Sequence, residues 1–205
     1  MKSIIVLLIV FIFISCSQES DDDTPLYIEP IFTNTPEKKL YIDVIYVVPS
    51  TNPNPKIYHL NETEYINHLN GSYFHRNNIG FVLGKISTLV SDELYDLRDN
   101  RNSETSTFLK ETKASYNKGR LNLYIMKRCN TIAIAGIGMD QRALITDEHI
   151  HKTTSPHEIG HALGLHHTTE EGNIMSMKRP YLRKEFNNEQ IKQLKKRIDE
   201  INQEN

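Results

Sequence analysis

The chain has 205 residues, which is enough for one domain of ordinary size and a short additional segment. Hydrophobic residues make up 38% of the sequence and charged residues 24%, close to the average of globular proteins, so wholesale disorder is excluded. The 24 basic and 26 acidic residues leave a formal net charge of -2, which provides no basic surface of the kind that nucleic-acid binding requires.

The first fifteen residues have the pattern of a secretory signal. Lys2 supplies a positive charge, residues 4–14 form an uninterrupted apolar run, and the small Ser15 precedes Cys16. A membrane-spanning helix needs about 20 apolar residues, so this run is too short to cross a bilayer comfortably. We therefore expect residues 1–15 to be removed as a signal peptide.

Residues 13–16 resemble a bacterial lipobox, in which the cysteine becomes the lipidated first residue of the mature protein. Phe13 departs from the usual leucine, but the acidic run 21–23 resembles the surface-export signal of some lipoproteins of Gram-negative bacteria. The resemblance implies an outer-membrane protein that is anchored through lipid at Cys16 and exposed on the cell surface. An ordinary cleaved signal with an incidental cysteine is the alternative.

The sequence provides no disulfide framework. Cys16 and Cys129 are its only cysteines, and if the first carries lipid, the second has no partner. Residues 16–39 are polar and acidic with three prolines, a composition typical of an extended tether. We expect the folded domain to span residues 40–205 and to be stabilised by its core.

Runs rich in isoleucine, valine and tyrosine, bounded by turn residues, predict five strands. These strands are expected at residues 40–48, 79–86, 121–126, 131–137 and 142–146. Residues 63–74 place apolar side chains at helical spacing and predict a helix. The polar stretch 91–118 has no firm period and is compatible with a short helix and a loop, so we assign it no structure.

A final helix is predicted near the end of the chain. Asn187 can cap it, and Gln190 three residues later can complete a capping box. An apolar stripe follows at helical spacing. It consists of Ile191, Leu194, Ile198 and Ile201. The stripe predicts that this helix packs on the domain.

Four of the nine histidines fall within residues 157–167. On an α-helix, residues four apart lie on one face, so His157 and His161 can direct their imidazoles at one ion. Gly164 tolerates the left-handed conformation that ends helices, so the chain can turn there and bring His167 to the same ion. Three neutral histidines leave a fourth coordination position open, as in a catalytic zinc site, whereas a structural zinc site closes with four protein ligands.

Two roles are open for Glu158. Ser155 suits the N-cap of this helix and Pro156 its first position, so Glu158 can complete a capping box. Because it follows His157 directly, it can instead hold a water at the metal and take its proton as a general base. The side chain cannot fill both roles at once.

Residues 157–167 match the H-E-x-x-H-x-x-G-x-x-H signature at every defining position and resemble the metzincin clan of zinc peptidases. Metzincins place a methionine in a tight turn beneath the metal. Met175, eight residues beyond His167, resembles that methionine, and Met177 is the alternative. Thr168, which follows the third histidine, matches no subfamily marker, so the family within the clan is left open.

The resemblance implies an α/β fold of the zincin type. We expect a twisted, mostly parallel five-stranded sheet with two helices behind it, an active-site helix, the methionine turn and a C-terminal helix. Residues 131–137 are the candidate for a single antiparallel edge strand. An extended peptide could pair with such an edge by backbone hydrogen bonds.

The same resemblance implies a monomeric zinc-dependent endopeptidase that acts on peptides or proteins. One catalytic Zn²⁺ would be held by His157, His161 and His167, with Glu158 as the general base and Met175 in the turn. The alternative is a zinc-containing surface lipoprotein that binds or adheres without cleaving, against which the intact glutamate argues. The residues do not reveal substrate preference, biological target, calcium sites or a propeptide.

Overall fold

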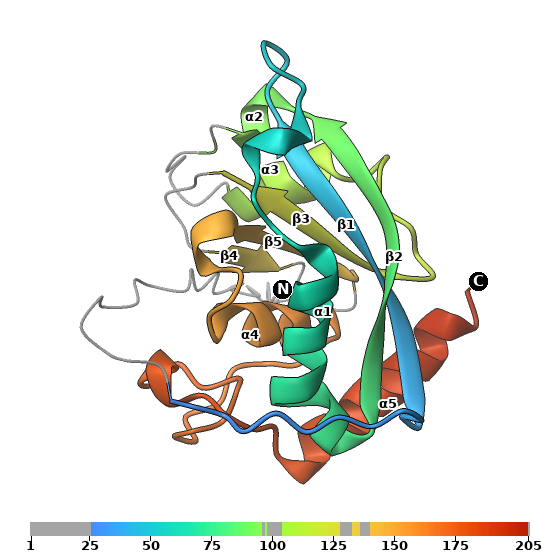
Figure 1. Cartoon of the computed structure of the whole chain (residues 1–205), viewed down its shortest axis with the longest axis vertical. Helices are drawn as coiled ribbons and strands as arrows, with labels where there is room; N and C mark the ends of the chain where they lie inside the picture. The colour runs from blue at the N-terminus through green and yellow to red at the C-terminus, as the bar shows by residue number, and fades with distance from the viewer. Residues whose placement is uncertain (1–25, 96, 98–103, 128–132, 136–139, 205) are drawn as a thin grey trace, which may run out of the picture.

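A five-stranded sheet forms the centre of the protein (Figure 1). The computed structural model describes residues 26–95, 97, 104–127, 133–135 and 140–204. The strands are β1 (Lys38–Val48), β2 (Ile79–Val90), β3 (Leu121–Met126), β4 (Ala133–Ala135) and β5 (Arg142–Thr146). Their order is β2-β1-β3-β5-β4, and all neighbours are parallel except β4, which pairs antiparallel with β5 at one edge. The predicted α/β class, the five strands and the antiparallel edge strand are confirmed.

The helices cover both faces of this sheet (Figure 1). They are α1 (Glu62–Leu69), α2 (Asp92–Tyr95), α3 (Glu104–Glu111), α4 (Thr154–Ala162) and α5 (Asn188–Asn202). Short 3-10 turns lie at Pro55–Ile57, His75–Asn77, Asp147–His149 and Pro180–Leu182, and a π turn at Asn70–Phe74 continues α1.

Side chains along each strand alternate between two apolar clusters, as the period of a strand requires. On β1, Val44 and Tyr46 face the larger cluster, to which α1, α4 and α5 contribute. Ile45 and Val47 face the smaller cluster, to which α2 and α3 contribute. The sheet is therefore covered on both faces, whereas the sequence predicted helices behind only one. The second layer comes from the polar stretch 91–118, whose helices α2 and α3 are too short to show a clear apolar period in the sequence.

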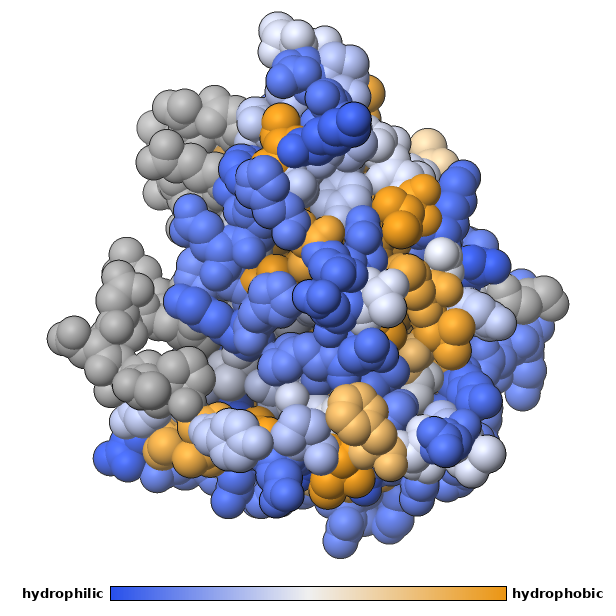
Figure 2. All heavy atoms as spheres, in the orientation of Figure 1, coloured by the Kyte–Doolittle hydropathy of each residue, from blue (hydrophilic) through white to orange (hydrophobic). Residues whose placement is uncertain are grey.

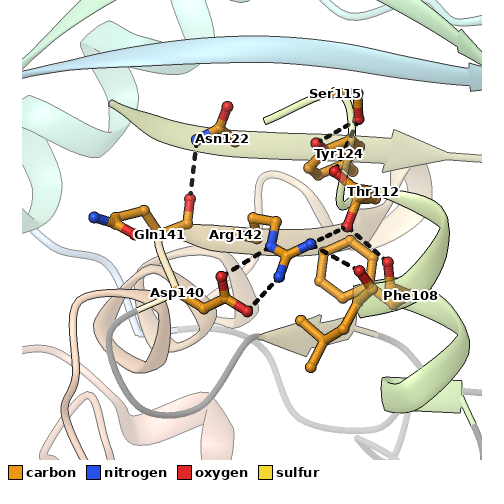
Figure 3. A network of polar contacts seen from close by, with 9 residues as sticks. Phe108, Thr112, Ser115, Asn122, Tyr124, Asp140, Gln141 and Arg142 are labelled. Atoms are coloured by element: carbon orange, nitrogen blue, oxygen red, sulfur yellow. Dashed lines mark hydrogen bonds and ion pairs between the residues drawn. The ribbon is translucent and has the colours of Figure 1, made fainter. Parts of the chain in front are cut away.

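A buried arginine ties this second layer to the sheet (Figure 3). The Nη1 atom of Arg142 donates to the Leu109 carbonyl at 2.9 Å and to the Thr112 hydroxyl at 2.8 Å. Its Nε donates to a carboxylate oxygen of Asp140 at 3.1 Å, and the guanidinium lies 4.3 Å from the centre of the Tyr116 ring. These contacts attach the end of α3 to the start of β5 across the face that is opposite to α4.

The outer strand β2 is longer than predicted. It pairs with β1 from Ile79 to Val90, so the ladder extends beyond the residues whose pattern indicates a strand. Val82, Ile86 and Val90 remain exposed on this strand, and Figure 2 shows hydrophobic residues at the same side of the molecule.

The predicted C-terminal helix and its cap are confirmed. Asn187 Oδ1 accepts from the backbone of Gln190 at 3.0 Å, and Gln190 Oε1 accepts from the backbone of Asn187 at 3.0 Å. Leu194, Ile198 and Ile201 are fully buried in the larger cluster. Among the described residues, no helix is long and apolar enough to cross a membrane.

Residues 26–37, the described part of the expected tether, contain no helix or strand and lie along the lower edge of the domain (Figure 1). Backbone N–H groups in this segment donate from Leu26 to the Tyr181 carbonyl at 3.2 Å and from Ile31 to the Gly71 carbonyl at 2.8 Å. The segment is thus extended but held against the domain. The expected signal peptide, Cys16, Cys129 and both ends of the predicted edge strand lie outside the described residues.

Candidate metal centre

Helix α4 ends as its glycine predicts. Gly164 has a φ of 93°, in the left-handed region that favours glycine. Its N–H donates to the His161 carbonyl at 2.9 Å, and the N–H of Leu165 donates to the Gly160 carbonyl at 2.9 Å. These two bonds form a Schellman motif, which satisfies the last carbonyls of the helix and reverses the direction of the chain.

The start of α4 differs from the prediction. The helix begins at Thr154, so Ser155 lies within its first turn and is not the N-cap. The Ser155 hydroxyl instead donates to the carbonyl of Ile150 in the preceding loop. A capping box joins the N-cap to the third helical residue, and Glu158 is the fifth. The capping role of Glu158 is therefore excluded, because the helix begins at Thr154, two residues before the predicted first position at Pro156.

The structure brings three imidazoles together. The Nε2 atom of His167 lies 3.2 Å from Nε2 of His157 and 2.9 Å from Nε2 of His161. One nitrogen from each ring lies within 4.8 Å of the others, and no other group of three potential ligands is found among the described residues. Tetrahedral coordination at Zn–N distances near 2.0 Å separates ligand nitrogens by roughly 3.3 Å. The three nitrogens are thus spaced to share one ion.

Backbone carbonyls orient two of these rings. Nδ1 of His157 donates to the Ile174 carbonyl at 2.7 Å, and Nδ1 of His161 donates to the Leu165 carbonyl at 2.8 Å. A carbonyl can only accept, so Nδ1 carries the hydrogen and Nε2 is left with its lone pair. The Nε2 lone pairs of His157 and His161 are thereby available to one ion. Such backbone partners are typical of histidines that bind metals.

The protonation of these rings also suits a metal. Burial lowers the pKa of His157 well below its ordinary value and lowers the pKa of His161 to about 4. The pKa of His167 is lowered as well, first by burial and then by the charge of Arg183. All three imidazoles are consequently neutral near pH 7, so no proton has to leave before a metal binds.

Glu158 follows His157 in the sequence of α4 and is only 2% exposed. Burial raises the pKa of its carboxyl to about 8, and the charge of Arg183 opposes this effect. A carboxyl group with a pKa close to neutrality can take up and release a proton there, as an acid–base catalyst must.

Met175 packs directly against α4. It is fully buried, and a Cβ added at Gly160 would overlap its Sδ atom and lie 3.3 Å from its Cε atom. Gly160 stands between the two helical histidines, so its missing side chain lets the methionine approach the helix backbone there. Met177, by contrast, is 46% exposed. Of the two candidate methionines, Met175 is thus the one that packs beneath α4.

The turn around Met175 is braced from two sides. Asn173 Oδ1 accepts from the backbone N–H of Met175 at 2.8 Å, and its Nδ2 donates to Gln190 Oε1 in the cap of α5 at 2.9 Å. The carbonyl of Ser176 accepts from Nε and Nη2 of Arg183, at 2.9 and 2.7 Å. The sequence gives no signal for Arg183, because it lies in a polar stretch with several other basic residues.

The fold and the histidine cluster place the chain in the class of metzincin-like zinc metallopeptidases. The family model of the matrixins, Peptidase_M10, matches residues 88–200, which is more than half of the chain. The protein therefore belongs to the matrixin family. The sequence signature on its own does not distinguish the families within the clan.

Solved structures share this fold at low sequence identity. Metalloproteinase-II from Bacteroides fragilis superposes with a TM-score of 0.52 and 18% identity, over 84% of this chain and 56% of that one. Archaemetzincin from Methanopyrus kandleri gives a TM-score of 0.52 and 12% identity, over 78% of this chain and 96% of that one. The chain thus spans little more than half the length of the Bacteroides protein. A comparison with curated proteins gave no match.

Proposed function

We propose that the protein is a zinc-dependent endopeptidase that acts as a monomer on peptides or proteins. In this proposal His157, His161 and His167 bind one catalytic Zn²⁺, and Glu158 is the general base. The observation that carries it is the convergence of the Nε2 atoms of the three histidines. Membership of a peptidase family supports the same conclusion.

The donor set fits zinc. Three neutral imidazoles without a thiolate suit zinc among the available divalent metals, and three protein ligands leave a position for a reactant. A zinc ion bound there supplies a Lewis acid that polarises a peptide carbonyl and makes water more acidic. The chain contributes the orientation of the ligands, through the carbonyls of Ile174 and Leu165.

Its place on α4 supports Glu158 as the proton carrier. It adjoins the ligand His157 on α4, and it is free of the capping role. As general base it would take a proton from the attacking water and pass it to the leaving amine, an effect of roughly 10²- to 10⁴-fold on rate. The charge of Arg183 partly opposes the effect of burial on the pKa of Glu158, and a bound zinc ion would oppose it further, which favours the ionised form that this step needs.

The edge strand offers a way to align the substrate. β4 is the last strand in the sheet order and packs near α4. An extended peptide that pairs with such an edge gains main-chain hydrogen bonds whatever its side chains are. This alignment would favour cleavage within a chain over removal of terminal residues.

The test is Glu158→Gln, assayed for zinc by elemental analysis and for cleavage with a peptide library. The variant should keep its zinc and its fold but lose nearly all activity, because the carboxylate is not needed to hold the metal. Full activity in this variant would refute the general-base role. Zinc without cleavage in the wild type would instead favour the alternative of a non-catalytic surface protein.

We also infer that the mature protein begins at a lipidated Cys16 and sits on the surface of the outer membrane. The lipobox-like residues 13–16 and the acidic run 21–23 support this localisation. One acyl chain anchors a protein only marginally, whereas several chains hold it firmly.

A further inference from the structure

Two arginines are buried within the described part of the chain, Arg142 and Arg183, each 5% exposed. A buried guanidinium is costly unless hydrogen bonds satisfy its donors. Arg142 ties α3 to the sheet, as described above. Arg183 directs Nε and Nη2 at the carbonyl of Ser176, at 2.9 and 2.7 Å. Because the two N–H groups belong to one planar guanidinium, they fix both the distance and the direction of the Ser176 carbonyl oxygen.

Ser176 belongs to the turn that touches the metal centre. Met175 precedes it and packs against α4 at Gly160. Ile174 comes before that, and its carbonyl accepts the Nδ1 hydrogen of His157 at 2.7 Å. Three consecutive residues therefore join the Arg183 guanidinium to the ring of a candidate ligand, and none of these contacts is exposed to solvent.

We propose that Arg183 is a positioning residue for the metal centre: by holding the Ser176 carbonyl it fixes the turn whose Ile174 carbonyl orients the His157 imidazole. The inference rests on the proposed function only in that the centre binds zinc. Partners that orient metal ligands from behind commonly change metal affinity by about 10- to 100-fold when they are removed. We expect an effect at the lower end of this range, since Arg183 acts through the turn.

The charge of Arg183 would have the opposite effect. A cation close to the centre repels a dication, and Arg183 is near enough to lower the pKa of His157. If Arg183 acted only through its charge, its removal would tighten zinc binding. If it acts by position, its removal weakens zinc binding. The sign of the change therefore separates the two roles.

The experiment compares Arg183→Met with Arg142→Met in the full chain. Zinc affinity is measured by competition with a chelator, and the melting temperature is measured with and without zinc. Arg183→Met should bind zinc about tenfold more weakly and gain less in melting temperature from zinc. Arg142→Met is the matched control, because its equally buried guanidinium lies across the sheet from α4. It should melt earlier without zinc but bind zinc with the affinity of the wild type.

Arg183→Lys keeps the charge but cannot place two donors of a fork on one carbonyl, so it should also bind zinc more weakly. Wild-type affinity in Arg183→Lys, or equal or tighter binding in Arg183→Met, would overturn the proposal. The lysine variant decides the matter if the methionine variant does not fold. A wild-type protein that binds no zinc would overturn the proposed function together with this inference. Zinc binding without peptide cleavage in the wild type would overturn only the proposed activity.

Discussion

Removing the metal should expose a dependence of stability on pH that originates in Glu158. Burial raises the pKa of this carboxyl to about 8 in the folded protein, against 4.5 for an ordinary glutamate. The folded state thus holds the proton more tightly than the unfolded chain does. The contribution of Glu158 to stability is complete below pH 4.5, the pKa in the unfolded chain. It is lost as the pH rises through about 8, the pKa in the folded protein.

The histidines act in the opposite direction and in a different range. Burial lowers the pKa of His157, His161 and His167 from 6.5, so the unfolded chain binds these protons more tightly. They reduce stability as the pH falls through 6.5, because the imidazoles of the unfolded chain take up protons there and the buried imidazoles do not. The unfolded imidazoles are still half protonated at pH 6.5, so the range from pH 6.5 to about 8 isolates Glu158 only when the pH dependence of Glu158→Gln, which has the same histidines, is subtracted.

Over this range the free energy of unfolding of the metal-free wild type, taken relative to Glu158→Gln, should fall by about 1.5 kcal/mol, from a slope near 1.4 kcal/mol per pH unit that levels off at the folded pKa. Urea denaturation with a chelator present measures it. Glu158→Gln does not titrate and should remove the loss. Restoring zinc should remove it as well, because a dication near the carboxyl favours the ionised form. An equal slope in the wild type and in Glu158→Gln would refute the assignment.

Three further predictions concern single positions. His161→Ala should lose its zinc, and elemental analysis that finds a full equivalent would remove His161 from the ligands. Met175→Leu should cost less than about 1.5 kcal/mol and Met175→Ala roughly 2 to 5 kcal/mol in urea denaturation. The exposed Met177→Ala should cost almost nothing, and a larger loss there than at Met175 would contradict the packing of the turn. Cys16→Ser should move the protein from the membrane to the soluble fraction; an unchanged distribution would count against lipidation.

The sequence by itself determined the features that depend on local geometry. The period of the strands, the capping box of Asn187 and Gln190, and the left-handed Gly164 are set by neighbouring residues, so each could be predicted without the fold. The spacing of His157 and His161 belongs to the same class, because four residues bring two side chains to one face of any helix.

Tertiary structure decided where distant segments meet. Helix α4 begins at Thr154, and the Ser155 hydroxyl donates to the Ile150 carbonyl of the preceding loop, so it does not cap the helix. The layer of α2 and α3 depends on burial against the sheet, which a short polar sequence does not reveal. Arg183 acquired a partner in the turn only when the chain had folded back on it, since its own surroundings in the sequence resemble any solvated basic stretch. Such contacts join residues that no local period links, and for that reason they had to be read from the structure.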